Sequence, residues 1–140
     1  MVQIETISII STKFIIPFLV GGFIFFSVII APNIFAKLDS KNARIFIRTI
    51  FPKLYTWGIV FSLVLTFLSL FYKPTLSFIF LLICSGFLFS KYFLVKWINQ
   101  LSDIKNKTKQ DKKKFAILHT LSVVVFISQI LLLTFVNFKI

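Results

Sequence analysis

Four long apolar stretches, separated by short charged segments, constrain this chain more than any other feature of its sequence. They cover about residues 14–36, 54–72, 74–97 and 115–138. A helix rises about 1.5 Å per residue, so the first stretch would extend about 35 Å, more than the roughly 30 Å hydrocarbon core of a bilayer. We therefore predict an all-α polytopic membrane protein, residues 1–140, in which four antiparallel transmembrane helices form a single domain.

The composition narrows the functional classes. The chain is 58% hydrophobic, contains 20 Phe and has a formal net charge of +12. Its basic residues lie between apolar stretches rather than on a polar surface, so we expect no nucleic-acid partner; the partner is the bilayer, including anionic lipid headgroups. One His and four acidic residues provide few metal ligands, and Cys84 is the single cysteine. We expect no metal, no cofactor and no catalytic residue, and we favour a protein that is not an enzyme.

The distribution of basic residues predicts the orientation in the membrane. Thirteen of the 16 Lys and Arg lie in residues 37–53 and 91–114. The first segment follows the first span, and the second covers the end of the third span and the loop after it. Both therefore lie on one side of a four-span protein. Basic loops face the cytoplasm. We expect cytoplasmic segments at 37–53 and 98–114, with both termini outside.

The first basic segment predicts a short interfacial helix between spans one and two. Lys41, Arg44 and Arg48 recur at helical spacing and share one face, while residues 45–47 supply apolar surface. Arg44 and Arg48 are candidates for binding a phosphate or carboxylate headgroup as a fork. The alternative is that these two arginines lie on a solvated face of the helix and bind no specific group. Their presence would then reflect only the excess of basic residues in cytoplasmic loops.

Five further residues are predicted to shape the corner between these spans. Gly22 removes a side chain and permits close helix packing. Pro32 is expected to kink or end the first helix, and Pro52 to break or bend the interfacial helix. We expect Phe35 and Phe51 to pack beneath the interfacial helix.

Polar residues within the fourth stretch are the other candidates for function. His119, Ser122 and Gln129 are placed on one helix face that should turn inward, because polar groups facing lipid are costly. A neutral His119 could accept a hydrogen bond from Tyr55. The alternative is structural: a hydrogen bond from His119 to a backbone carbonyl freed by a proline.

Three patches resemble a known family. They are Gly22 with residues 31–35 (APNIF) and Leu38, residues 50–55 (IFPKLY), and residues 115–122 (FAILHTLS). In order and spacing they are similar to the transmembrane protein 205 family and its bacterial relatives, a four-span domain of unknown function. The resemblance implies a location in the bacterial inner membrane, and it implies no enzymatic activity.

The sequence leaves three functional hypotheses. The first is a membrane protein that binds a lipid or small hydrophobic ligand between helices near the cytoplasmic face. The second is a membrane enzyme or electron carrier that uses His119 with haem or quinone. The third is a small transporter; four helices enclose little space, so it would act as a homo-oligomer or with a membrane-protein partner.

Overall fold

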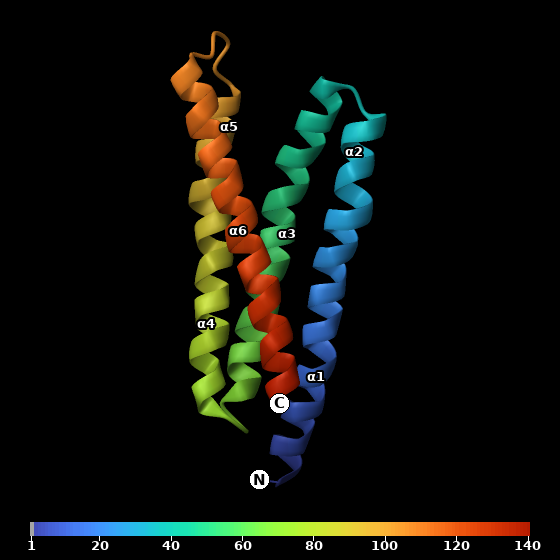
Figure 1. The fold of residues 1–140 in the computed structure, drawn as a ribbon. Coiled ribbons are helices and arrows are strands. Elements are labelled where there is room, and N and C mark those ends of the chain that lie inside the picture. The colour runs from blue at the N-terminus through green and yellow to red at the C-terminus, as the bar shows by residue number, and fades with distance from the viewer. Residues whose placement is uncertain (1) are drawn as a thin grey trace.

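The structure is a computed structural model that describes residues 2–140, and nearly all of the described chain is helical (Figure 1). Two short π-helical segments, η1 and η2, join α1 to α2 and α4 to α5 without a break, so residues 2–140 form four long rods. All four are long and apolar enough to cross a membrane, which confirms the predicted fold class. The elements are α1 (Val2–Phe25), η1 (Phe26–Ile30), α2 (Ala31–Lys37), α3 (Ser40–Ser69), α4 (Pro74–Phe89), η2 (Ser90–Leu94), α5 (Val95–Ser102) and α6 (Lys109–Lys139).

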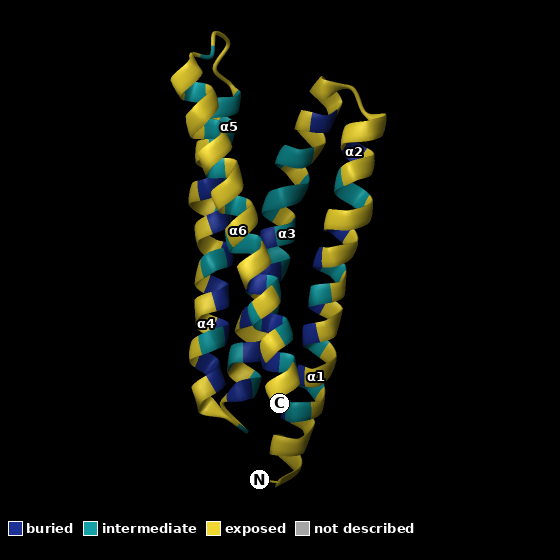
Figure 2. Ribbon diagram, in the orientation of Figure 1, coloured by how far each residue is buried: buried dark blue, intermediate teal, exposed yellow. Residues whose placement is uncertain are grey.

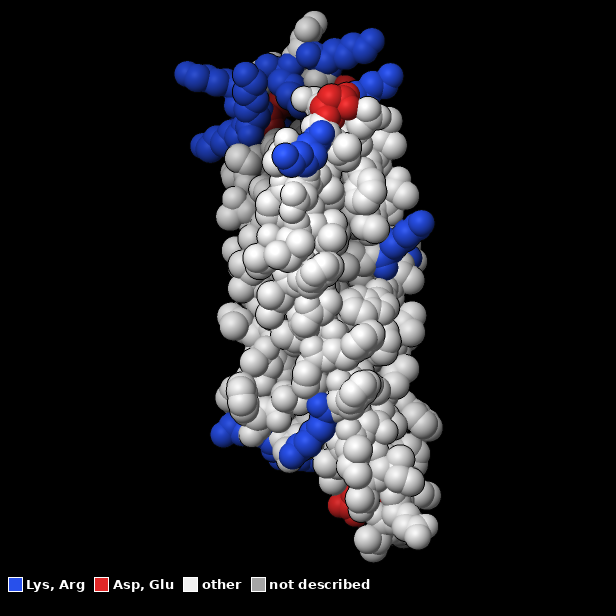
Figure 3. Space-filling view, turned by 90° about the vertical axis from the view of Figure 1, so that its right-hand side faces the viewer, with Lys and Arg blue, Asp and Glu red and all other residues white. Residues whose placement is uncertain are grey.

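The rods run antiparallel, with both termini at one end of the molecule. The α2–α3 and α5–α6 connections lie together at the opposite end, which is called the basic end below because lysines and arginines gather there (Figures 1 and 3). Large apolar side chains cover the outside: Phe14 is 75% exposed, Phe78 76% and Phe138 82%. Such a surface is typical of helices that cross a membrane.

The packed core occupies the half of the bundle nearer the termini. Phe23, Phe80 and Phe87 are fully buried at its centre. Glycines allow the rods to approach: a Cβ on Gly22 would overlap the Trp57 ring, and a Cβ on Gly58 would lie 2.9 Å from three atoms of the Phe87 ring. Most of the buried positions lie in this half (Figure 2). The terminal half is therefore closed by aromatic packing.

The structure corrects the prediction of a separate interfacial helix. Helix α3 runs without interruption from Ser40 to Ser69, so residues 40–51 continue the second rod through Pro52. A proline inside a helix removes one hydrogen bond and strains the preceding turn. Tertiary packing offsets that cost, since the Phe51 ring meets the Phe26 ring edge-on at 5.5 Å. Phe35, in contrast, is 66% exposed and does not pack beneath α3.

Pro32 also has a different consequence from the one expected. It does not end the first rod, because helix α2 continues past it to Lys37. The turn before it is widened instead: in η1 the Ala31 N–H donates to the carbonyl of Phe26, five residues back. Such a π-helical turn places an extra residue ahead of the proline ring. The segment η2 repeats this geometry, with the Val95 N–H donating to Ser90.

Candidate functional site

The rods diverge toward the basic end and enclose a cavity of about 690 Å³. Its walls come from α1 to α3, α5 and α6, and they are largely apolar, with Phe26, Leu94 and Phe126 among the lining residues. Ligand sites in proteins typically measure about 300–1,000 Å³. This cavity therefore has the size and wall chemistry of a site for a hydrophobic molecule.

Five of the six candidate ligand-binding residues line this one cavity. Arg44, Arg48 and Tyr55 reach it from α3, and His119 and Ser122 reach it from α6. They are far apart in sequence and come together because α3 and α6 bound the same space. The sequence predicted that His119 and Ser122 share a helix face and that His119 lies near Tyr55, but it did not connect these residues with Arg44 and Arg48.

Tyr55 forms part of the inner end of the cavity. Its side chain is almost fully buried, at 3% exposure, and its ring lies 6.0 Å from that of Phe51 and 6.4 Å from those of Phe87 and Phe126. Within residues 2–140 its hydroxyl has no hydrogen-bond partner. Tyr55 lines the cavity. It therefore offers a polar contact to a molecule in the cavity.

His119 lies nearer the basic end, on an exposed part of α6. Its ring stacks against that of Phe115 at 6.2 Å, and its carbonyl accepts a hydrogen bond of 2.7 Å from the Ser122 hydroxyl. No hydrogen bond from the imidazole is found among residues 2–140, so neither the expected bond with Tyr55 nor a bond to a carbonyl freed by a proline is present there. The imidazole is thus available to the cavity.

Gln129 does not line the cavity. It lies ten residues, about 15 Å, further along α6 than His119. It is buried against α4, where its Nε2 donates to the carbonyl of Ile83 at 2.9 Å. A Cβ on Gly86 would come within 2.5 Å of that nitrogen, so the glycine makes the space for it. Gln129 thus joins α6 to α4.

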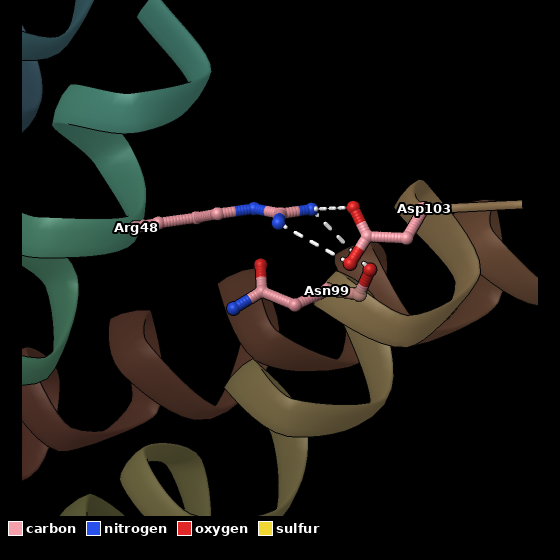
Figure 4. Close-up of polar contacts among 3 residues, drawn as sticks. All are labelled: Arg48, Asn99 and Asp103. Atoms are coloured by element: carbon pink, nitrogen blue, oxygen red, sulfur yellow. Dashed lines mark hydrogen bonds and ion pairs between the residues drawn. The ribbon is translucent and has the colours of Figure 1, made fainter.

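Arg48 crosses from α3 to the end of α5 beside the cavity (Figure 4). Its guanidinium donates to both carboxylate oxygens of Asp103, at 2.5 and 3.2 Å, and to the carbonyl of Asn99 at 3.4 Å. The hydrogen bond from Arg48 and the charges of Arg44 and Lys107 lower the pKa of Asp103 below its usual range. Asp103 was not predicted as a site residue. The sequence feature that could have indicated it is that it is an acidic residue in a segment rich in lysine.

Arg44 lies in a different environment from Arg48. It lines a second, smaller pocket of about 450 Å³ at the basic end, most of whose walls are polar. The two arginines that were predicted to act together therefore differ. Arg48 forms an ion pair with Asp103, whereas Arg44 has no ion-pair partner within residues 2–140. The other lining residues of this basic pocket are Ser102, Asp103, Ile104, Lys105, Lys107 and Lys112.

Comparison with protein families gives one match. The model described as "Domain of unknown function (DUF4149)" matches residues 14–107, about two thirds of the chain. The chain belongs to this family. The DUF4149 match begins within α1 and ends before α6, so it includes Arg44, Arg48 and Tyr55, while His119 and Ser122 lie beyond it. Neither the curated proteins nor the solved structures provide a match to the chain.

In residues 2–140 no three His, Cys, Asp or Glu side chains are grouped so that they could hold a metal ion. The site residues offer an apolar wall, the Tyr55 hydroxyl, the His119 imidazole and cationic groups at the basic end.

Proposed function

We propose that this DUF4149 protein binds a lipid acyl chain from the surrounding bilayer in the cavity between α1–α3, α5 and α6. The observation that carries the proposal is the convergence of Arg44, Arg48, Tyr55, His119 and Ser122 on one largely apolar cavity of about 690 Å³. Apolar walls gain free energy by contact with hydrocarbon, and the cations stand where a headgroup would lie.

The length of the cavity supports an acyl chain as its occupant. Arg44 and Tyr55 are eleven residues apart on α3 and both line it. At about 1.5 Å per residue this separation is about 16 Å, and half of a bilayer's hydrocarbon core is about 15 Å. A lipid with its headgroup near Arg44 would have its chain ends near Tyr55.

Photocrosslinking in lipid bilayers tests the proposal. The purified full chain is reconstituted with a phospholipid bearing a diazirine on one acyl chain, irradiated, digested and mapped by mass spectrometry. We expect adducts on cavity residues such as Phe126. Ser122→Phe should place a bulky ring in the cavity, obstruct it and reduce these adducts several-fold.

Ser128→Phe is the matched control. Ser128 is also a serine of α6 whose hydroxyl donates to a backbone carbonyl, but it is exposed and lies outside the cavity. This variant should leave the labelling of Phe126 unchanged. Equal labelling of Phe126 in the wild type and in Ser122→Phe would contradict the proposal.

A ring-shaped hydrophobic cofactor is the second candidate occupant. It is supported by two polar groups that line the cavity, the partner-free Tyr55 hydroxyl and the His119 imidazole. These groups could hold the two carbonyls of a quinone, or His119 could ligate haem. An absorption spectrum of the purified protein tests haem; for a quinone, Tyr55→Phe should weaken binding, whereas it should leave acyl-chain binding unchanged.

We infer further that the chain resides in the bacterial inner membrane with both termini outside. The concentration of lysine and arginine at one end of the bundle supports this orientation (Figure 3). Relationship to the transmembrane protein 205 family is also a proposal, supported by the residues at 31–35, 50–55 and 115–122.

A further inference from the structure

We propose that the basic pocket beside the cavity is a headgroup subsite that selects phospholipids of net negative charge. This inference rests on the proposed acyl-chain function and adds the chemical class of the lipid. The pocket is lined by the cationic residues Arg44, Lys105, Lys107 and Lys112.

The basic pocket and the apolar cavity adjoin. Arg44 and Ser102 line both of them. Lys107, from the basic pocket, places its ammonium 5.7 Å from the ring centroid of Phe115, which lines the apolar cavity. A molecule that occupies both spaces would therefore have an anionic group joined directly to a hydrocarbon chain.

The charges of the basic pocket favour an anion. Its carboxylate, Asp103, is bonded to Arg48, so Arg44 and the three lysines outnumber the negative charge available to them. A guanidinium can bind two phosphate oxygens at once, and lysines act as point charges. A zwitterionic headgroup would bring an ammonium or choline into the same pocket, and the repulsion of that group by the cations would cancel their attraction for the phosphate.

A phospholipid fits these observations better than free phosphate does. Free phosphate would occupy the basic pocket and leave the adjoining apolar cavity of about 690 Å³ without a partner. The hydrocarbon chain supplies apolar contact that a soluble phosphate ester lacks. We therefore expect the lipid to bind far more tightly than its headgroup alone.

The experiment measures binding of three probes to the full chain in nanodiscs of neutral lipid. The probes are a fluorescent phosphatidylglycerol, a phosphatidylcholine with the same chains, and glycerol phosphate as competitor. Arg44→Gln with Lys112→Gln removes two cations of the pocket. Lys96→Gln with Lys109→Gln is the control, because both lysines are exposed and lie outside the pocket.

We expect phosphatidylglycerol to bind more tightly than phosphatidylcholine. Each cation removed should weaken it about fivefold, so the double variant loses about 25-fold. Phosphatidylcholine binding should be unchanged in that variant, and the control pair should bind like the wild type. Glycerol phosphate should displace the lipid only at far higher concentration.

Several results would overturn the inference. They are equal affinity for the two lipids, equal loss in the control pair, or glycerol phosphate binding as tightly as the lipid. Ser122→Phe separates this inference from the proposed function. If both lipids bind equally but Ser122→Phe weakens both, the acyl-chain function stands and the headgroup subsite is wrong; if Ser122→Phe weakens neither, both proposals are wrong.

Discussion

Gly58→Ala should destabilise the bundle because of one specific contact. The new Cβ would lie 2.9 Å from Cδ2, Cε2 and Cζ of Phe87, which is fully buried and cannot move without displacing Phe23, 5.3 Å away. Overpacking of this kind costs about 1–3 kcal/mol. Replacing glycine by alanine in a helix returns about 1 kcal/mol, so we expect a net loss of about 0–2 kcal/mol.

The sign of this effect should reverse when the obstructing ring is removed. Phe87→Ala alone should cost about 3–5 kcal/mol in a well-packed core. In that background the Cβ of Gly58→Ala meets no ring, and only the gain of up to about 1 kcal/mol from helix propensity remains. The coupling between the two substitutions should therefore be about 1–3 kcal/mol.

Equilibrium unfolding in mixed micelles, followed by circular dichroism, measures all four variants of the cycle. Gly21→Ala is the control, since no atom lies within 4 Å of the Cβ it would add. It should stabilise the protein by up to about 1 kcal/mol in both backgrounds. If Gly58→Ala has the same effect with and without Phe87, within about 0.5 kcal/mol, the steric reasoning is refuted.

Three further predictions concern the basic end. In a Cys84→Ser background, single cysteines across residues 105–114 should resist a membrane-impermeant maleimide applied to intact cells; labelling from outside would reverse the proposed orientation. The pKa of Asp103 is lowered in the folded state, so its contact with Arg48 should persist above the ordinary carboxyl pKa and be lost as pH falls through the lowered value. Spin labels on α3 and α5 would report that separation, and a change near neutral pH would contradict it. His119→Gln should change the free energy of unfolding by no more than about 0.5 kcal/mol, because its imidazole makes no hydrogen bond within residues 2–140; a larger loss in the same unfolding assay would show a structural role.

The number and class of the helices could be predicted because hydrocarbon thickness imposes them. Any apolar stretch as long as residues 14–36 has few alternatives in a membrane. The extent of each helix could not be predicted in the same way. The sequence around Pro52 contains a real local signal for a break, and the contact between Phe51 and Phe26 overrides it; such a contact depends on where α1 lies.

The candidate site was predictable residue by residue but not as an arrangement. Polar groups such as His119 and Arg44 stand out in an apolar sequence, and the cost of exposing them to lipid indicates that they matter. Which groups these side chains contact depends on how the helices pack together. The prediction grouped Gln129 with His119 and Ser122 on one face of α6, and only the position of α4 shows that the Gln129 side chain bonds to Ile83 and does not line the cavity. Likewise, the division of Arg44 from Arg48 depends on Asp103, which α5 brings to α3.

Each of the two π-helical segments divides its rod into two parts. The side chains of one part are rotated about the helix axis relative to those of the other. Phe26 from η1 and Leu94 from η2 both line the cavity, so both segments border it. One extra residue turns everything beyond it by about 100°. The direction in which α2 and α5 present their cavity-lining side chains is therefore independent of the direction in which α1 and α4 present theirs to the aromatic core. Deleting one residue from either segment would preserve each half of the rod but present a different set of side chains to the cavity.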